Sequence, residues 1–191
     1  MKIIAAKMFK DKDGSTLLLM VMIIVTVILL GTTLLGITMS QYKIRKANSE
    51  IKRVFYLSET GINESYLDVY SLIYTASNYS LIKAEEYLIS NPDDITEATN
   101  IYKTNYKQYV IKNVLSYINN NGNPQIKVVN TGNLYFINEK LTVKVSSKYI
   151  SIVGIEKTID ADIIVSIPDF IKARLGDIDF FKLLDMANFD L

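Results

Sequence analysis

The sequence predicts an α+β fold built on one long N-terminal helix, and three features carry this prediction. The first is an apolar run near the N-terminus that no charged residue interrupts. The second is an amphipathic repeat, with steps of three and four residues, that continues this run. The third is a change to a period of two after Pro124, which is typical of antiparallel strands. Helices followed by a meander of strands give an α+β layout.

The apolar run is long enough to cross a membrane. Charged residues stop just before Gly14, and residues 15–41 contain none. Residues 17–37 are apolar apart from threonines and glycines, and about 20 helical residues cross a hydrocarbon core of ~30 Å. A secretory signal has a shorter apolar stretch of ~7–15 residues and a small-residue cleavage site, which does not follow here. We therefore expect a membrane span. Basic residues flank both of its ends, so the charge pattern does not determine its orientation.

The helical pattern continues beyond the run. Apolar residues recur from Ile44 to Ile73 in steps of three and four, and no proline occurs before Pro92. We expect one helix from about Ser15 to about Tyr74, on the order of 90 Å long, with a transmembrane first half and an amphipathic second half.

Two further helices are expected before the sheet. A short one would begin at Asn78 or Ser80 and end before Pro92. A longer one would be capped by Asp93 or Asp94 and end in the breaker at residues 119–124.

The strands are expected in the C-terminal half. Candidates are residues 125–130, 134–138, 141–145 and 158–167. The alternation slips at residues 146–148, which predicts a bulge before a further strand segment at residues 150–153. The tail contains four of the chain's seven phenylalanines, and Asp177 is a candidate cap for a last short helix. These four rings either pack under the sheet or form a partner surface; they are Phe170, Phe180, Phe181 and Phe189.

This pattern divides the chain into five segments. They are an N-terminal segment (residues 1–14), the transmembrane half of the helix (15–40), a helical region beyond the span (41–124), an antiparallel sheet (125–168) and an aromatic tail (169–191); the family resemblance described below implies that the first segment is a leader and that the third is extracytoplasmic.

Composition argues against catalysis and against nucleic acid as a partner. The chain has no cysteine, histidine or tryptophan and a net charge of +1. It therefore lacks the commonest general base, the thiol nucleophile and the usual zinc ligands. Asp93, Asp94 and Glu97 lack the glycine and the alternating donors of a calcium loop, so a helix cap is the simpler interpretation. We expect no enzyme activity, no metal and no cofactor.

The N-terminal region resembles a known family. A short basic leader ending in glycine, then an uncharged helix with an amphipathic second half, resembles the class III signal of type IV pilin-like proteins. Residues 13–36 and 51–66 are similar to PilX-type minor pilins, which have an aromatic-Tyr-x-x-Glu-x-Gly element after the span. That element corresponds here to Phe55, Tyr56, Glu59 and Gly61.

The resemblance implies processing, orientation and partners. Prepilin peptidase would cut between Gly14 and Ser15 on the cytoplasmic side, and the new amine would be methylated. The leader would lie inside and the body outside the cytoplasmic membrane. The partners would be other pilin or pseudopilin subunits, and Phe55, Tyr56, Glu59 and Gly61 would serve assembly in a pilin-like fold.

One departure from the family is informative. Major pilins carry glutamate at the fifth mature position, where this chain has Leu19. A carboxylate at membrane depth costs ~2.5–3.5 kcal/mol on insertion scales, so it persists only where it is paired. In the family its partner is the amino terminus of a neighbouring subunit. Leu19 cannot form this pair, which favours a tip or initiating component over the repeating subunit.

A second hypothesis comes from another class. The chain would be a permanently anchored single-pass protein with an extracytoplasmic receptor or sensor module. Cleavage at Gly14 distinguishes the two hypotheses, because an ordinary anchor keeps its first residues.

Overall fold

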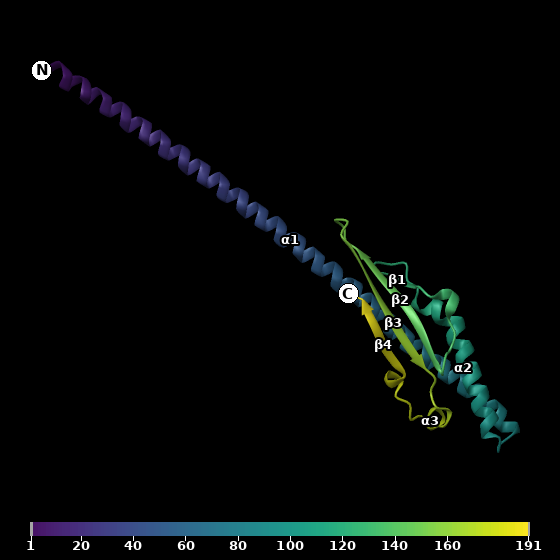
Figure 1. Ribbon diagram of the computed structural model, residues 1–191. Helices are drawn as coiled ribbons and strands as arrows, with labels where there is room; N and C mark the ends of the chain where they lie inside the picture. The colour runs from purple at the N-terminus through teal and green to yellow at the C-terminus, as the bar shows by residue number, and fades with distance from the viewer. Residues whose placement is uncertain (1, 191) are drawn as a thin grey trace. The chain divides into compact units, whose positions relative to one another are not determined.

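The computed structural model describes the backbone of residues 2–190 and the side chains of residues 16–188 (Figure 1). The chain divides into two compact units, Met1–Ser49 and Glu50–Leu191. Helix α1 (Lys2–Ser90) supplies the first unit and the beginning of the second. The second unit also contains α2 (Ile95–Ile118), a four-stranded antiparallel sheet and the short helix α3 (Phe170–Leu175). The expected α+β fold is confirmed.

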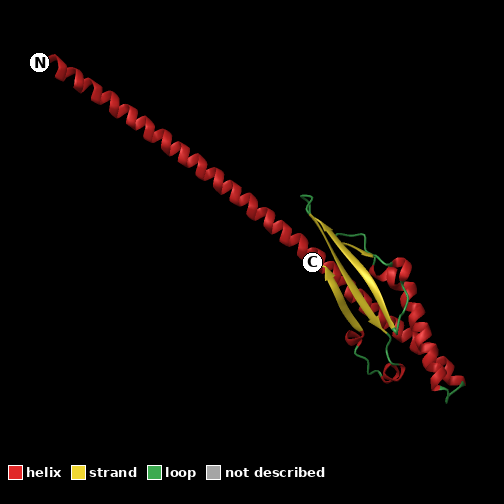
Figure 2. Cartoon of the chain, viewed as in Figure 1, coloured by secondary structure: helices red, strands yellow, loops and turns green. Residues whose placement is uncertain are grey.

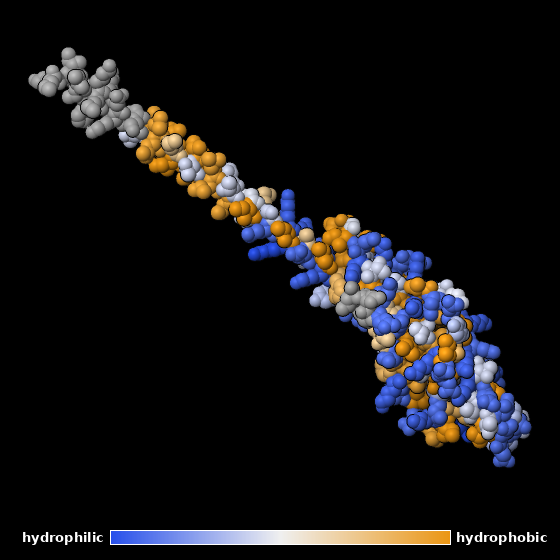
Figure 3. Space-filling model, in the orientation of Figure 1, coloured by the Kyte–Doolittle hydropathy of each residue, from blue (hydrophilic) through white to orange (hydrophobic). Residues whose placement is uncertain are grey.

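The first unit contains the apolar part of α1. The large apolar side chains from Leu17 to Met39 are about half to two-thirds exposed, between 49% and 70%. The surface of this stretch is predominantly orange in Figure 3, which marks hydrophobic residues. The hydroxyls of Thr26, Thr33 and Thr38 donate to carbonyls of the preceding turn, so they leave no unsatisfied donor on this apolar surface. Within the part of the chain that the structure describes, this is the helix long and apolar enough to cross a membrane, which is compatible with a single-pass membrane protein.

The second unit has one sheet with helices on one of its faces (Figure 2). The strands are β1 (Gln125–Val128), β2 (Lys140–Ile150), β3 (Glu156–Ser166) and β4 (Leu184–Asp190), in the spatial order β1-β2-β3-β4. Strands β2 and β3 form a hairpin that pairs without interruption from Lys140 opposite Ser166 to Ile150 opposite Glu156. Alternate residues of this hairpin are buried, as the period of two requires.

The core lies between this sheet and the helices. Helix α1 contributes Ile62, Val69, Leu72 and Ile73, and α2 contributes Tyr106, Val110 and Val114. These side chains contact the inward-facing residues of the strands, which are Ile126, Val128, Leu141, Val143, Val145, Ile159, Ala161, Ile163, Val165 and Leu184. A smaller cluster joins the far ends of α1 and α2 through Leu88, Tyr102 and Phe170. In the described chain, the first fully buried apolar side chain is that of Val54, so the second unit has its own core.

Asp94 caps α2 as expected, because its side chain accepts a hydrogen bond from the N–H of Glu97. The expected break in α1 after Tyr74 is wrong, and α1 continues to Ser90. Ser80 does not cap a new helix; it is buried, and its hydroxyl donates to the carbonyl of Ala76 in the same helix.

The sheet differs from the sequence prediction in three places. Residues 134–138 are not a strand; they follow a short 3-10 helix, η1 (Thr131–Asn133), and only Ile137 forms an isolated bridge. The bulge expected at residues 146–148 is absent from the β2–β3 pairing, where Ser147 takes a buried position, and the irregularity lies between Asp160 and Asp162 instead. The tail forms a fourth strand, β4, which was not expected.

The tail also differs in its caps. Asp169 caps α3 and Asp179 caps the 3-10 helix η2 (Phe180–Leu183), whereas the N–H of Asp177 closes the end of α3 by donating to Lys172. Phe170 is buried and Phe180 packs edge-on against Tyr70. Phe181 stacks on Tyr70 but stays 55% exposed, and the side chain of Phe189 lies outside the described residues.

Candidate functional site

The segment from Phe55 to Gly61 joins α1 to the sheet. Ser58 and Gly61 are buried toward the strands, and Phe55 is partly buried against the core. Tyr56 lies on the other side of the helix and is 62% exposed, with its ring in edge contact with Phe55 at 5.7 Å between centroids. The helical period therefore gives this segment one face for the sheet and one for the surroundings.

Gly61 is required by close packing. A Cβ atom at this position would overlap the Oγ atom of Ser147 in β2 and would lie 3.0 Å from Cγ of Pro124. Only glycine lets the helix and the strand approach this closely. Gly61, expected as an assembly residue, therefore has a role inside the unit.

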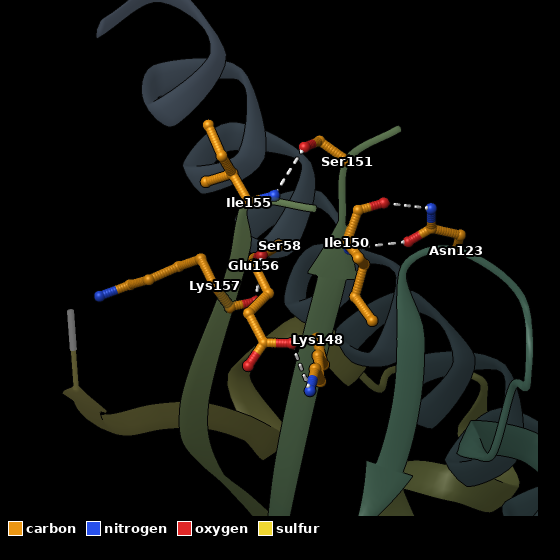
Figure 4. A network of polar contacts seen from close by, with 8 residues as sticks. All are labelled: Ser58, Asn123, Lys148, Ile150, Ser151, Ile155, Glu156 and Lys157. Atoms are coloured by element: carbon orange, nitrogen blue, oxygen red, sulfur yellow. Dashed lines mark hydrogen bonds and ion pairs between the residues drawn. The ribbon is translucent and has the colours of Figure 1, made fainter. Parts of the chain in front are cut away.

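Ser58 ties the same face of α1 to the start of β3 (Figure 4). Its hydroxyl lies 2.9 Å from the carbonyl oxygen of Lys157 and 3.0 Å from that of Val54, and donates toward both. Because Ser58 is buried, this bond gives its hydroxyl a partner in β3 and links the helix to the start of the strand.

Side-chain amides complete the edge of the sheet beside this contact. The side chain of Asn123 accepts from the N–H of Ile150 and donates to its carbonyl oxygen, at 3.2 and 2.9 Å (Figure 4). The side chain of Asn130 makes the equivalent bonds with Lys144 N–H and Thr142 O, at 2.9 and 2.8 Å. Strand β1 is only four residues long, and these two amides replace backbone bonds beyond both of its ends.

The turn between β2 and β3 carries the most exposed apolar side chain in the described chain. Ile152 is 101% exposed and Val153 is 63% exposed. The turn itself is well defined: Gly154 N–H donates to the carbonyl of Ser151, and Gly154 has the positive φ of 81°. Sequence reasoning treated residues 150–153 as part of a strand and missed this feature, although two β-branched residues just before a glycine were a visible signal.

Glu59 and Leu19 belong to different units. Glu59 is half-buried and has no hydrogen-bond or ion-pair partner among the described residues. Leu19 belongs to the first unit and is 60% exposed. The side chains of Gly14 and Ser15, the expected processing site, lie outside the described residues.

The two tyrosines whose pKa values are raised most are part of the core. Burial raises the pKa of Tyr102 to about 12, against the lowering effect of its hydrogen bond with Ser77. Burial also raises the pKa of Tyr106 strongly. Both tyrosines lie in the core between α1 and α2 and not in a cleft with a nucleophile. Among the described residues, no cluster of acidic side chains could hold a metal ion.

The contacts of Gly61 with Ser147 and of Ser58 with Lys157 hold helix α1 against the sheet.

Comparisons with protein-family models, with curated proteins and with solved structures find no match for this chain.

Proposed function

We propose that the protein is a minor pilin or pseudopilin, a structural subunit at the tip or the start of a type IV pilus or a related secretion filament. The observation that carries the proposal is one continuous helix that contains an uncharged, exposed apolar stretch at residues 17–37 and whose last part lies in the core of an α+β unit. An apolar helix with no packing partner in its own chain needs either lipid or the helices of other subunits. A pilin uses lipid before assembly and other helices afterwards.

The proposal assigns processing and topology. Prepilin peptidase removes residues 1–14, Ser15 becomes the methylated first residue, and the second unit lies outside the cytoplasmic membrane. The partners are pilin or pseudopilin subunits and the peptidase, and the protein acts as a scaffold and not as an enzyme. The abrupt end of the charged residues before Gly14 supports this assignment.

Leu19 supports the position at the tip. In a repeating subunit, a missing fifth-position carboxylate would leave the amine of the next subunit unpaired in apolar surroundings, and an unpaired buried charge is costly. At the tip no subunit lies ahead, so leucine carries no such cost there.

Intact mass tests the processing step. Expressed beside an active prepilin peptidase, the wild-type protein should lose residues 1–14, and Gly14→Ala should keep the precursor mass. Gly31→Ala is the matched control, because it alters a glycine of the same helix with no neighbour within 4 Å and should be processed normally. A wild-type chain that keeps its leader beside the active peptidase would instead support a permanently anchored receptor or sensor.

Copy number tests the position in the filament. Quantitative immunoblotting of sheared filaments should find far less than one copy per major subunit. Stoichiometry near that of the major subunit would rule out the tip even if cleavage at Gly14 occurred.

A further inference from the structure

The outer face of the sheet, which is the face without helices (Figure 2), is divided by charge. Along each strand, the residues that alternate with the buried ones point to this face. Among the side chains that the structure describes, the charged ones on this face are all basic on β1 and β2 and all acidic on β3 and β4. The basic residues are Lys127, Lys140, Lys144 and Lys148, and the acidic residues are Glu156, Asp160, Asp162 and Asp185. The face therefore has a basic half and an acidic half.

The chain itself neutralises few of these charges. Lys148 and Glu156 form an ion pair at 2.8 Å, where the two halves meet. Lys144 lies directly opposite Asp162 in the β2–β3 register, but Asp162 accepts a hydrogen bond from the side-chain amide of Asn188 at 2.8 Å instead. The residues of this face without an ion-pair partner in the described chain include Lys127, Lys140, Lys144 and Asp160. Most of the charge on each half can therefore act on another molecule.

A hollow of about 450 Å³ lies on this face between the two halves. Lys144 lines its basic side, and Asp160 and Asp162 line its acidic side. Lys144 and Asp160 are exposed and Asp162 is half-buried, so all three charged groups can be reached from outside. A surface that fits this hollow must carry the opposite order of charges, with an acidic group facing Lys144 and an ammonium group facing the two carboxylates.

A second copy of the chain has this order of charges. In a two-fold dimer the same surface of both copies forms the interface, so this surface must be complementary to itself. A two-fold axis parallel to the strands, between β2 and β3, places the basic half of each copy over the acidic half of the other. An axis perpendicular to the strands would place like charges over each other, which is unfavourable. Because Lys144 and Asp162 lie at the same level of the sheet, the first axis brings Lys144 of each copy to Asp162 of the other.

We propose that the outer face of the sheet binds a second copy of the chain about a two-fold axis parallel to the strands, with Lys144 of each copy paired with Asp162 of the other. Thr142 and Ile164 also lie at one level, next to this pair, and the same axis packs Ile164 of each copy against Thr142 of the other. Opposite charges across an interface contribute more to orientation and association rate than to affinity, so we expect an association that is sensitive to salt.

The inference is independent of the proposed pilin function. All of its residues belong to the second unit, and none of its steps uses the apolar run or the processing site. A pair of copies at a filament tip would still be far fewer than the copies of a major subunit. Failure of the dimer would therefore leave the proposed function untouched, and the reverse is also true.

Reversal of single charges tests the arrangement in the full-length protein. Sedimentation equilibrium in a density-matched detergent should show a wild-type dimer whose dissociation constant rises several-fold from about 50 mM to about 500 mM salt. Lys144→Asp and Asp162→Lys should each weaken the dimer at least about tenfold, because like charges then face each other at two places. An equimolar mixture of the two variants should restore the dimer, because both pairs then join opposite charges across the axis. Lys112→Asp, at an exposed position of α2 without an ion pair in the described chain, is the matched control and should not change the association.

Two neutral variants keep the test decisive if a charge reversal disturbs folding, which near-UV circular dichroism would show. Lys144→Gln and Asp162→Asn retain the size of each side chain, and Asp162→Asn retains an oxygen that can accept from Asn188. Each should weaken the dimer less than the reversal does, and their mixture should not restore it. Unchanged association in both neutral variants would overturn the inference.

Three further outcomes contradict the proposed dimer. A wild-type protein that stays monomeric at every concentration shows that this face does not bind a second copy. Association that persists in both reversal variants lies on another surface, such as the apolar run of α1. Weakening in both reversal variants without recovery in their mixture shows that positions 144 and 162 do not meet across a two-fold axis.

Discussion

Gly61 of α1 and Ser147 of β2 are packed so closely that a Cβ atom on the glycine would overlap the serine hydroxyl oxygen. This contact sets how closely the helix can approach the sheet. Ser58 and Gly61, one turn apart, fix the same face of α1 by a hydrogen bond and by close packing. At this point of the core the helix and the sheet are thus joined by small side chains.

We expect Gly61→Ala to destabilise the second unit by about 1–3 kcal/mol, the usual cost of adding a methyl group to a tight contact. Thermal unfolding of the full chain in mild detergent, followed by near-UV circular dichroism of the tyrosines, measures the loss. Gly132→Ala is the matched control, since nothing lies within 4 Å of its added Cβ. Equal stability of the two variants would mean that the helix and the sheet are farther apart at this point.

Ser147→Ala should be neutral or stabilising by up to about 1 kcal/mol. The Ser147 hydroxyl is fully buried and has no hydrogen-bond partner among the described residues, so its removal relieves a desolvation penalty. The same substitution should recover part of the stability lost in Gly61→Ala, because the overlapping oxygen is gone. A strong loss of stability in Ser147→Ala would contradict an unpaired hydroxyl.

The elements that could be predicted from sequence are those governed by local periodicity. The long helix, α2 with its Asp94 cap and the β2–β3 alternation belong to this group. Asn78 and Ser80 misled the prediction because side chains that cap helices can also lie within one, where Ser80 bonds back to Ala76. Strand β4 has no alternating pattern and depends on its pairing with β3, which is a tertiary contact. Position 61 was singled out by a family resemblance, but its reason, the contact with Ser147, joins residues far apart in the sequence.

Tyr102 should make the second unit sensitive to alkali. Burial gives its hydroxyl a pKa of about 12 in the folded state, against about 10 in the unfolded chain. The unfolded state therefore loses its proton first, and stability falls as the pH rises from 10 to 12, by about 2–3 kcal/mol for this residue.

Two variants separate this effect from general alkaline unfolding. Tyr102→Phe should reduce the pH dependence to the part due to the other buried tyrosine, Tyr106, while costing about 1–3 kcal/mol at neutral pH, since Ser77 loses its bond of 2.7 Å. Ser77→Ala keeps the ionisable group and should keep the alkaline loss. Denaturant unfolding at pH 8 and pH 11 measures the free energy of unfolding of the wild type and of both variants. The same loss between these two pH values in all three proteins would exclude Tyr102 as a cause.

Asn130 should protect the edge of β2. Asn130→Ala removes two hydrogen bonds, to Lys144 N–H and to Thr142 O, and should cost about 1–2 kcal/mol. Asn130→Asp keeps the acceptor for Lys144 N–H and should lose about half as much. Hydrogen exchange of the Lys144 amide is the direct measurement, with faster exchange expected in Asn130→Ala. Asn133→Ala, an exposed neighbour without a side-chain bond among the described residues, should leave this exchange unchanged.

The last prediction concerns the second unit alone. A fragment that begins at Gln41 should be soluble and fold with mixed α and β structure, because both clusters of buried residues come from positions after residue 50. The apolar side chains that it leaves behind, residues 17–37, are exposed and contribute nothing to these clusters. Circular dichroism should show helix and strand together, and dispersed amide signals should show a packed core. A disordered chain, or aggregation that persists without the apolar run, would mean that the second unit needs residues 1–40 or a partner subunit to fold. In that case its core, although it closes between α1, α2 and the sheet, would not bury enough apolar surface to offset the loss of chain entropy on folding.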